Sequence, residues 1–218
     1  MRFGLLFLGV FLVTTSAHAD KMDETLDISL RLSGGWADVD GLSLHAAPLD
    51  VAPDLVEAAD LHLMGRGPGL SGTLRGNIQL SGFRLGAGFG YAAIDGLTLG
   101  HMPLADGATL HADRLWGMPF EIFAGYAFRF WDEVQPYFEA RGSLTVLQTQ
   151  IEAIHPELGS LGTTAFNGYA PGIGMSIGVL VPINEYFFFD AGGSVDVIGP
   201  TRLSIHAALG IPIPLANL

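Results

Sequence analysis

Apolar and polar residues alternate strictly in eight stretches of this chain. In LDISLRLSGGW, residues 26–36, leucine, isoleucine and tryptophan hold one parity, and aspartate, serine and arginine hold the other. The alternation recurs at residues 74–80, 83–93, 120–130, 136–146, 172–181, 187–197 and 202–211, with Phe123 a bulky exception on the polar parity. A period of two places successive side chains on opposite faces of a strand. The pattern predicts eight amphipathic strands and no helix of comparable clarity.

The connections between these stretches alternate in length. Links of hairpin length follow the second, fourth and sixth stretches, and the last turn, Gly199-Pro200, is also short. The other connections are long loops, at about residues 38–69, 96–115 and 148–168. Long loops on one side and short turns on the other predict an all-β fold, an eight-stranded antiparallel up-and-down transmembrane β-barrel with periplasmic short turns. Within the first loop, Pro53 and Asp54 suit a helix start, so we expect a short helix in residues 52–65.

The two-residue link Ser81-Gly82 also predicts a register. If Leu80 faces Phe83 across it, apolar residues meet apolar residues on the neighbouring strand and polar residues meet polar ones. Register and pattern then agree.

Three glycines of the third stretch, Gly86, Gly88 and Gly90, look like a fragment of a nucleotide-binding loop. Such a loop must end a strand and open a helix, whereas the alternation here continues past Gly90. We therefore expect the glycines to line the inner wall and to leave room for Arg75 and Arg84.

Composition indicates which face of the strands meets which solvent. The chain is 49% hydrophobic with a mean hydropathy of +0.40, yet after residue 20 it contains no apolar run long enough for a spanning helix. Without helices, only a closed barrel satisfies every backbone donor and acceptor in hydrocarbon. A soluble lipocalin-like barrel is the alternative, but Lys21 is the only lysine, and the polar face is mostly glycine, serine and alanine. We expect the apolar face to meet lipid and the polar face to fill a narrow lumen.

Residues 1–19 have the parts of a cleaved secretory signal peptide. Arg2 precedes an apolar run at residues 4–13, and Ala17-His18-Ala19 is a small-x-small cleavage site. Residues 20–218 would form the barrel domain. The chain has no cysteine, which excludes disulfides and a lipid-anchored lipoprotein, and its net charge of −12 argues against nucleic acid as a partner.

Charged residues on the polar parity are nearly balanced in sign. They are Asp27, Arg31, Arg75, Arg84, Glu121, Arg129, Glu139, Arg141, Asp190, Asp196 and Arg202. Because an isolated charge away from water is costly, we expect a paired network that plugs the lumen, with a small pore as the alternative. A last hairpin turning about Gly199 would place Asp196 opposite Arg202, so we expect these two to pair.

Aromatic residues gather near both ends of the predicted strands, as expected where a bilayer meets water. The predicted girdles contain Trp36, Tyr91 and Trp116 near the long loops and Trp131, Tyr137 and Tyr186 near the short turns.

With these strands, turns and girdles, residues 26–213 resemble the small eight-stranded outer-membrane barrels of the OmpA and OmpX type. The resemblance implies a monomeric outer-membrane protein with a structural or surface-interaction role and no cofactor. It implies as partners outer-membrane lipid, lipopolysaccharide and the barrel insertion machinery. Barrels of this family usually end in an aromatic residue, whereas this chain ends IPIPLANL.

Two kinds of chemistry remain as alternatives. A lipid A deacylase-like enzyme would need a nucleophile and a base, and Ser194 and His206 are candidates with Asp196 nearby. Both point into the expected lumen, and we expect no catalytic residues. The loop histidines, His45, His62, His101, His111 and His155, lie among acidic residues, but their spacing matches no recognised metal site. We therefore expect solvated acidic loops near the lipopolysaccharide headgroups and no dedicated metal site. A divalent cation held by His62 and Asp60, or by His111 and Asp113, is the alternative.

Overall fold

The computed structural model describes residues 24–46, 61–95, 98–99, 109–111, 114–128, 134–198 and 201–217. The predicted signal peptide and its cleavage site lie outside these residues. No helix within the described ranges is long and apolar enough to cross a membrane.

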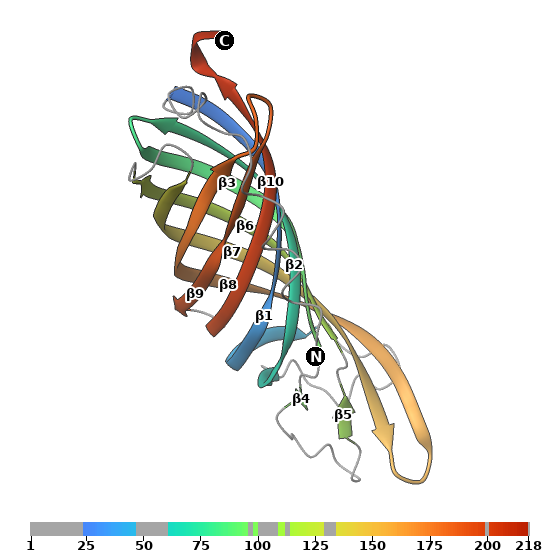
Figure 1. Ribbon diagram of the computed structural model, residues 1–218. Coiled ribbons are helices and arrows are strands. Elements are labelled where there is room, and N and C mark those ends of the chain that lie inside the picture. The colour runs from blue at the N-terminus through green and yellow to red at the C-terminus, as the bar shows by residue number, and fades with distance from the viewer. Residues whose placement is uncertain are drawn as a thin grey trace, which may run out of the picture.

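Eight long strands form a closed antiparallel barrel (Figure 1). They are β1 (Glu24–Ala46), β2 (Leu61–Leu80), β3 (Phe83–Asp95), β6 (Arg114–Ala127), β7 (Gln135–His155), β8 (Gly159–Pro182), β9 (Phe188–Ile198) and β10 (Thr201–Pro214). Each pairs with its neighbours in sequence order, and β1 also pairs with β10, which closes the ring. Two short strands, β4 (Thr98–Leu99) and β5 (Thr109–His111), pair with β2 and β7, and a 3₁₀ turn, Leu215–Asn217, follows β10. The predicted eight-stranded fold is confirmed.

The β2–β3 turn has the predicted register. Leu80 pairs with Phe83, and the polar residues behind the turn pair with one another. Ser81 and Gly82 both have positive φ, 46° and 87°, as a two-residue hairpin requires. A Cβ at Gly82 would lie 2.8 Å from the carbonyl oxygen of Ala127 and from the ring of Tyr126, so glycine is needed for both backbone and space.

Side chains alternate between the lumen and the outside as the pattern predicts. On β1, Asp27 and Arg31 are 0% and 3% exposed, whereas Leu30 and Leu32 are 55% and 61% exposed. The polar face therefore points inward along this strand, and the apolar face covers the outer surface.

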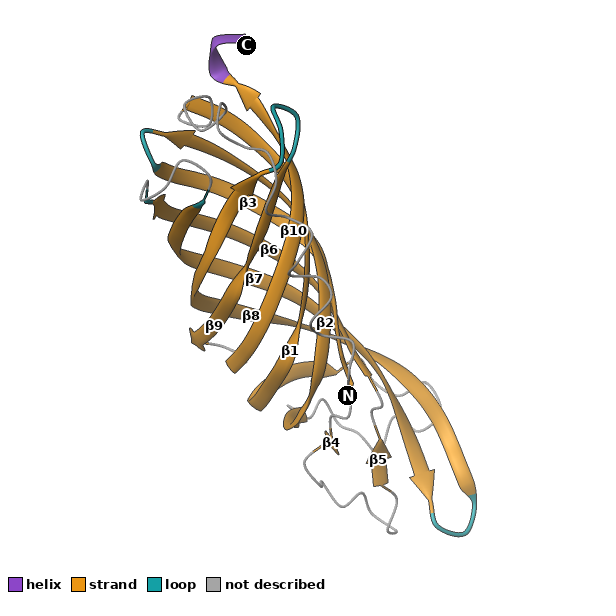
Figure 2. Cartoon of the chain, in the orientation of Figure 1, coloured by secondary structure: helices purple, strands orange, loops and turns teal. Residues whose placement is uncertain are grey.

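The predicted long loops are in large part strands. β1 continues to Ala46, β2 begins at Leu61, and β7 and β8 form a hairpin that closes at residues 156–158. This hairpin projects beyond the barrel, at the end opposite the β2–β3 and β8–β9 turns (Figure 2). The prediction of a helix at residues 52–65 is wrong for residues 61–65, which begin β2, while residues 52–60 lie outside the described part. Beyond the barrel a hairpin pairs its own backbone groups, so it needs no alternating apolar face and gives no pattern to detect.

Candidate functional site: the charged lumen

Four charged side chains meet in the middle of the lumen. Arg75 Nε lies 2.8 Å from Glu121 Oε1, and Arg75 Nη2 lies 2.9 Å from Glu139 Oε2. Arg84 Nη1 lies 2.7 Å from the other oxygen of Glu139. Glu139 is 0% exposed, so one fully buried carboxylate holds two arginines that come from β2 and β3.

Aromatic rings pack against both of these arginines. The guanidinium of Arg75 lies 3.5 Å from the ring centroid of Phe123, and that of Arg84 lies 4.7 Å from the centroid of Tyr137. Phe123 points inward because its cross-strand partner is Gly86, where an added Cβ would overlap its ring. The bulky exception in the alternating pattern is therefore a lumen residue that fills the space a glycine leaves.

The glycines of β3 make room for the network, as expected for Arg75. A Cβ at Gly88 would lie 3.1 Å from Arg75 Cγ and 3.0 Å from a carboxylate oxygen of Glu121. At Gly86 the nearest side chains are those of Phe123 and Asn77 rather than that of Arg84.

A second cluster joins β1, β7, β9 and β10. Arg31 Nη2 donates to Asp190 Oδ2 at 2.7 Å and to the hydroxyl of Tyr137 at 3.1 Å. The Tyr137 hydroxyl donates to Asp190 Oδ1 at 2.7 Å, and His206 Nε2 lies 2.8 Å from that hydroxyl. Because a hydroxyl has one proton and Asp190 accepts it, His206 Nε2 must be the donor in its contact.

Neutral amides lie nearer the short turns. Asn77 Nδ2 donates to Asp27 Oδ2 at 3.1 Å, and Gln79 Nε2 donates to Gln135 Oε1 at 3.2 Å across the lumen. We call this region, from Gln79 and Gln135 up to Glu139 and Asp190, the short-turn half of the lumen. Its polar side chains are almost entirely buried.

Asp196 lies beside Arg202, as predicted from the last hairpin, but its ion-pair partner is Arg141 and the predicted ion pair is wrong. Arg141 donates to Asp196 Oδ1 from Nη2 at 2.5 Å and from Nε at 3.2 Å, and its Nη1 lies 3.8 Å from Glu121. Gly174 explains this choice, because it lies between Arg141 on β7 and Asp196 on β9 in the register and leaves the path between them open. Arg202 Nη2 donates instead to Ser71 Oγ at 2.7 Å.

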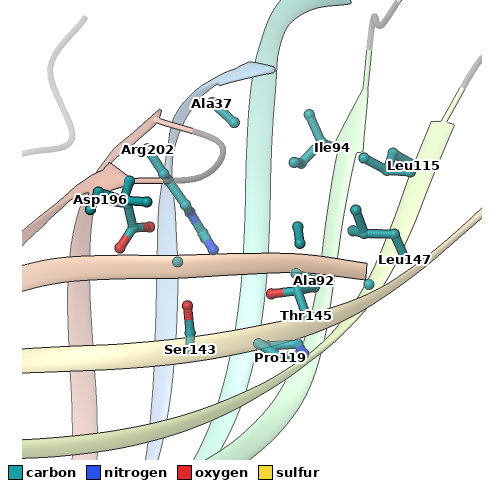
Figure 3. A pocket seen from close by; sticks show the side chains of 14 residues that line it. Ala37, Ala92, Ile94, Leu115, Pro119, Ser143, Thr145, Leu147, Asp196 and Arg202 are labelled. Atoms are coloured by element: carbon teal, nitrogen blue, oxygen red, sulfur yellow. The ribbon is translucent and has the colours of Figure 1, made fainter. Parts of the chain in front are cut away.

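A cavity lies next to Asp196 and Arg202, in the half of the lumen toward the extended hairpins. Its volume is about 70 Å³. Its lining includes Ala37, Ala92, Ile94, Leu115, Pro119, Ser143, Thr145, Leu147, Ala170, Asp196 and Arg202 (Figure 3). We call the half of the lumen that contains this cavity the long-loop half.

The predicted network residues thus fall into two connected groups and two outliers. Within the described residues every lumen arginine except Arg202 forms an ion pair, and every lumen acid except Asp27 does. Arg129 lies outside the described residues. The sequence pattern placed these groups on one face, but it could not choose their partners, because partners across the lumen are far apart in the chain.

The residues predicted to form aromatic girdles differ in where their side chains lie. Trp36, Tyr91 and Tyr186 are 54%, 49% and 63% exposed on the outer surface. Trp116 is half-buried and packs against Tyr91, with ring centroids 5.2 Å apart. The assignment of Tyr137 to a girdle is wrong, because its side chain is in the lumen and 3% exposed. Trp131 lies outside the described residues.

Two ion pairs at the rim were not predicted from the sequence. Arg66 Nε lies 2.7 Å from Asp38 Oδ2, and Arg114 forms an ion pair with Asp95 and lies over the ring of Trp116. Both pairs are exposed and join adjacent strands. The cross-strand register, continued past the ends of the apolar stretches, places the two residues of each pair opposite one another.

The proposed nucleophile and base have other partners. Ser194 Oγ lies 2.7 Å from Ser204 Oγ, which is directly across the β9–β10 pairing. His206 contacts Tyr137 and lies 3.5 Å from Asp190 Oδ1. Both candidates are 6% exposed inside the lumen. The described residues contain no cluster of three metal-ligating side chains. Of the loop histidines, the side chains of His45, His62 and His101 are not described.

The barrel is similar to solved structures of small outer-membrane proteins. Neisserial surface protein A gives a TM-score of 0.49 at 14% identity, covering 87% of this chain and 97% of that one. The attachment invasion locus protein Ail of Yersinia pestis gives 0.44 at 11% identity, covering 88% and 100%. The outer membrane protein OprG from Pseudomonas aeruginosa gives 0.44 at 12% identity, covering 88% and 98%. No protein-family model and no curated protein matches the sequence.

Proposed function

We propose that this chain is an integral outer-membrane barrel with a structural or surface-interaction role, and that its lumen is plugged by the ion-paired side chains. The observation that carries the proposal is an exposed apolar belt around a closed barrel. Leu70, Ile122, Ile177, Leu203 and Ile205 are 70%, 68%, 64%, 67% and 75% exposed. Contiguous apolar surface on this scale is unfavourable in water and favourable against lipid.

The height of the belt fits a bilayer. On β1 the outward apolar positions run from Leu26 to Trp36. Ten residues at about 3.3 Å each span about 33 Å along the strand, and a tilt near 40° reduces this to roughly 25 Å of vertical height. The upper edge of the belt carries Trp36 and the rim ion pair Asp38–Arg66, as expected where headgroups replace hydrocarbon.

The short-turn half supports a closed lumen rather than a wide pore. Gln79, Arg75, Arg84, Glu139 and Asp190 are each no more than 3% exposed. Side chains from opposite walls hydrogen-bond directly, as between Gln79 and Gln135. An eight-stranded barrel is just wide enough for its side chains to fill it.

The partners in this proposal are outer-membrane lipid and lipopolysaccharide around the belt and the barrel insertion machinery during assembly. The barrel is monomeric. Its surface role belongs to the projecting β7–β8 hairpin, and the proposal includes no catalytic step or cofactor.

Two measurements test the proposal. Expressed in a diderm bacterium, the full chain should fractionate with the outer membrane and shift mobility on a denaturing gel only after boiling. In planar bilayers it should show no stable conductance steps. Recovery in the soluble periplasm would contradict the membrane location, whereas stable conductance steps from the inserted protein would contradict only the plug.

A further inference from the structure

We propose that the cavity in the long-loop half binds a small monocarboxylate with a short apolar tail, such as propionate. The inference goes beyond the membrane role, because it assigns a ligand site inside the barrel. It begins with Arg202, the described lumen arginine that lacks an ion pair.

The guanidinium of Arg202 is held in place but incompletely paired. Its Nη2 donates to Ser71 Oγ at 2.7 Å, and its buried Nε has no hydrogen-bond partner among the described residues. The Nε atoms of Arg31 and Arg84 also lack such a partner, but the guanidinium groups of those two arginines form ion pairs. Asp196 lies beside it in the cavity (Figure 3), but Arg141 already contacts that carboxylate at 2.5 Å. A buried donor without a partner in a folded protein calls for a missing acceptor.

The charge balance of the lumen points the same way. Asp27, the described lumen acid without an ion pair, lies ten residues before Ala37 on β1, and Ala37 pairs with Arg202. That separation is about 33 Å along the strand, so the two cannot pair. Asp196 and Glu121 lie near Arg202, but they already pair with Arg141 and Arg75, so neither acid pairs with Arg202 alone. An anion in the long-loop half would complete this group.

The side chains that line the cavity indicate the chemistry of the rest of the ligand. Opposite Arg202 and Asp196 lie Ile94, Leu115 and Leu147 (Figure 3). Alanines at positions 37, 92 and 170 line the cavity without filling it. A hydrated inorganic anion gains nothing from such walls, whereas a carboxylate with a short alkyl tail satisfies both Arg202 and the apolar side.

The size of the cavity limits the length of the tail. A volume of about 70 Å³ exceeds the roughly 10–15 Å³ that one water needs and is smaller than the about 150 Å³ of a cavity that holds benzene. Propionate, with its three carbons and two oxygens, matches that space.

The experiment is a titration of the full chain, refolded in detergent micelles, followed by NMR of the methyl groups of Leu115 and Leu147. Sodium propionate, 1-propanol and sodium sulfate are compared at constant ionic strength. Propionate should give saturable shifts, and neither the alcohol nor sulfate should. Arg202→Gln should weaken propionate by about tenfold or more, since a charge-assisted hydrogen bond is lost.

Two further variants separate the site from general effects. Ala92→Leu fills the apolar wall and should also abolish saturation, even if Arg202→Gln does not fold. Arg66→Gln is the matched control, because Arg66 is an exposed arginine at the rim and its loss should leave propionate binding unchanged. The boiling-dependent gel shift establishes that each variant is a folded barrel, so a failed titration counts against the site and not against the barrel.

Three outcomes overturn the inference: no saturable propionate shift, an equal response to sulfate, or an equal response to 1-propanol. The first removes the site, the second makes it a general anion site, and the third makes it merely apolar.

Discussion

Both halves of the lumen contain buried arginines, but one half is filled by side chains and the other contains a cavity. In the short-turn half, Arg75 and Arg84 are buried and both bind the buried carboxylate of Glu139, and an aromatic ring packs on each arginine. In the long-loop half, Arg202 is held by one serine and faces a cavity lined by small and apolar residues. A narrow barrel is therefore closed where opposite charges and rings fill it, and hollow where alanines replace them.

The largest loss of stability is expected when the carboxylate that holds two arginines is removed. Glu139→Gln should lower the free energy of unfolding by about 3–5 kcal/mol, because two buried arginines then lose their shared anion. Urea unfolding from lipid vesicles, followed by tryptophan fluorescence, measures it. Asp38→Asn, which breaks an exposed rim pair, is the control and should cost at most about 1 kcal/mol. Equal losses in the two variants would mean that the short-turn half is not specially stabilised.

The tight packing of the short-turn half can be tested at Gly86. Gly86→Ala should cost about 1–3 kcal/mol, because the new methyl group would overlap the ring of Phe123 and the carbonyl oxygen of Gly76. Gly76→Ala is a matched change on the outer face, where an added Cβ has nothing within 4 Å, and should be nearly neutral. The same unfolding assay compares them, and a neutral Gly86→Ala would refute the packing argument.

The hydroxyl of Tyr137 joins Arg31, Asp190 and His206. Tyr137→Phe should lower stability by about 1–2 kcal/mol, because the hydroxyl is lost while the Arg31–Asp190 ion pair remains. A stability unchanged from wild type would show that the hydroxyl does not connect this cluster.

The smallest effect is expected in the long-loop half. Arg202→Ala should lower the melting temperature only slightly, by the equivalent of about 1 kcal/mol or less, since one hydrogen bond to Ser71 is lost and no carboxylate loses its ion-pair partner. A loss as large as that of Glu139→Gln would place Arg202 in the plug and erase the distinction between the two halves.

The barrel could be predicted from the sequence because the different environments of its two faces require apolar and polar residues to alternate. Lipid on one side and a polar lumen on the other require alternation along every strand, and the Ser81-Gly82 turn then determines the β2–β3 register. Tyr137 shows the limit of this reasoning, since its position near a strand end suggested a girdle while its parity pointed inward. Parity was the better guide.

Contacts across the lumen could not be predicted from the sequence. The Arg141–Asp196 pair depends on the gap that Gly174 leaves on the strand between them, and the inward turn of Phe123 depends on Gly86. Both contacts depend on a glycine, which has no side chain, at the facing position of a neighbouring strand. The extended hairpins were missed for a different reason, because strands that leave the membrane lose the two solvents that impose alternation.

The central claim, that the apolar face of a closed barrel meets lipid, has a direct test because the chain contains no cysteine. Single cysteines introduced at Leu30, Leu74 and Leu209 can each carry a spin label in the bilayer-reconstituted protein. Collision rates with oxygen and with a water-soluble nickel chelate are then compared by electron paramagnetic resonance. We predict high collision rates with oxygen and low rates with the chelate at all three positions. High rates with the chelate would mean that this face meets water and would contradict the membrane barrel.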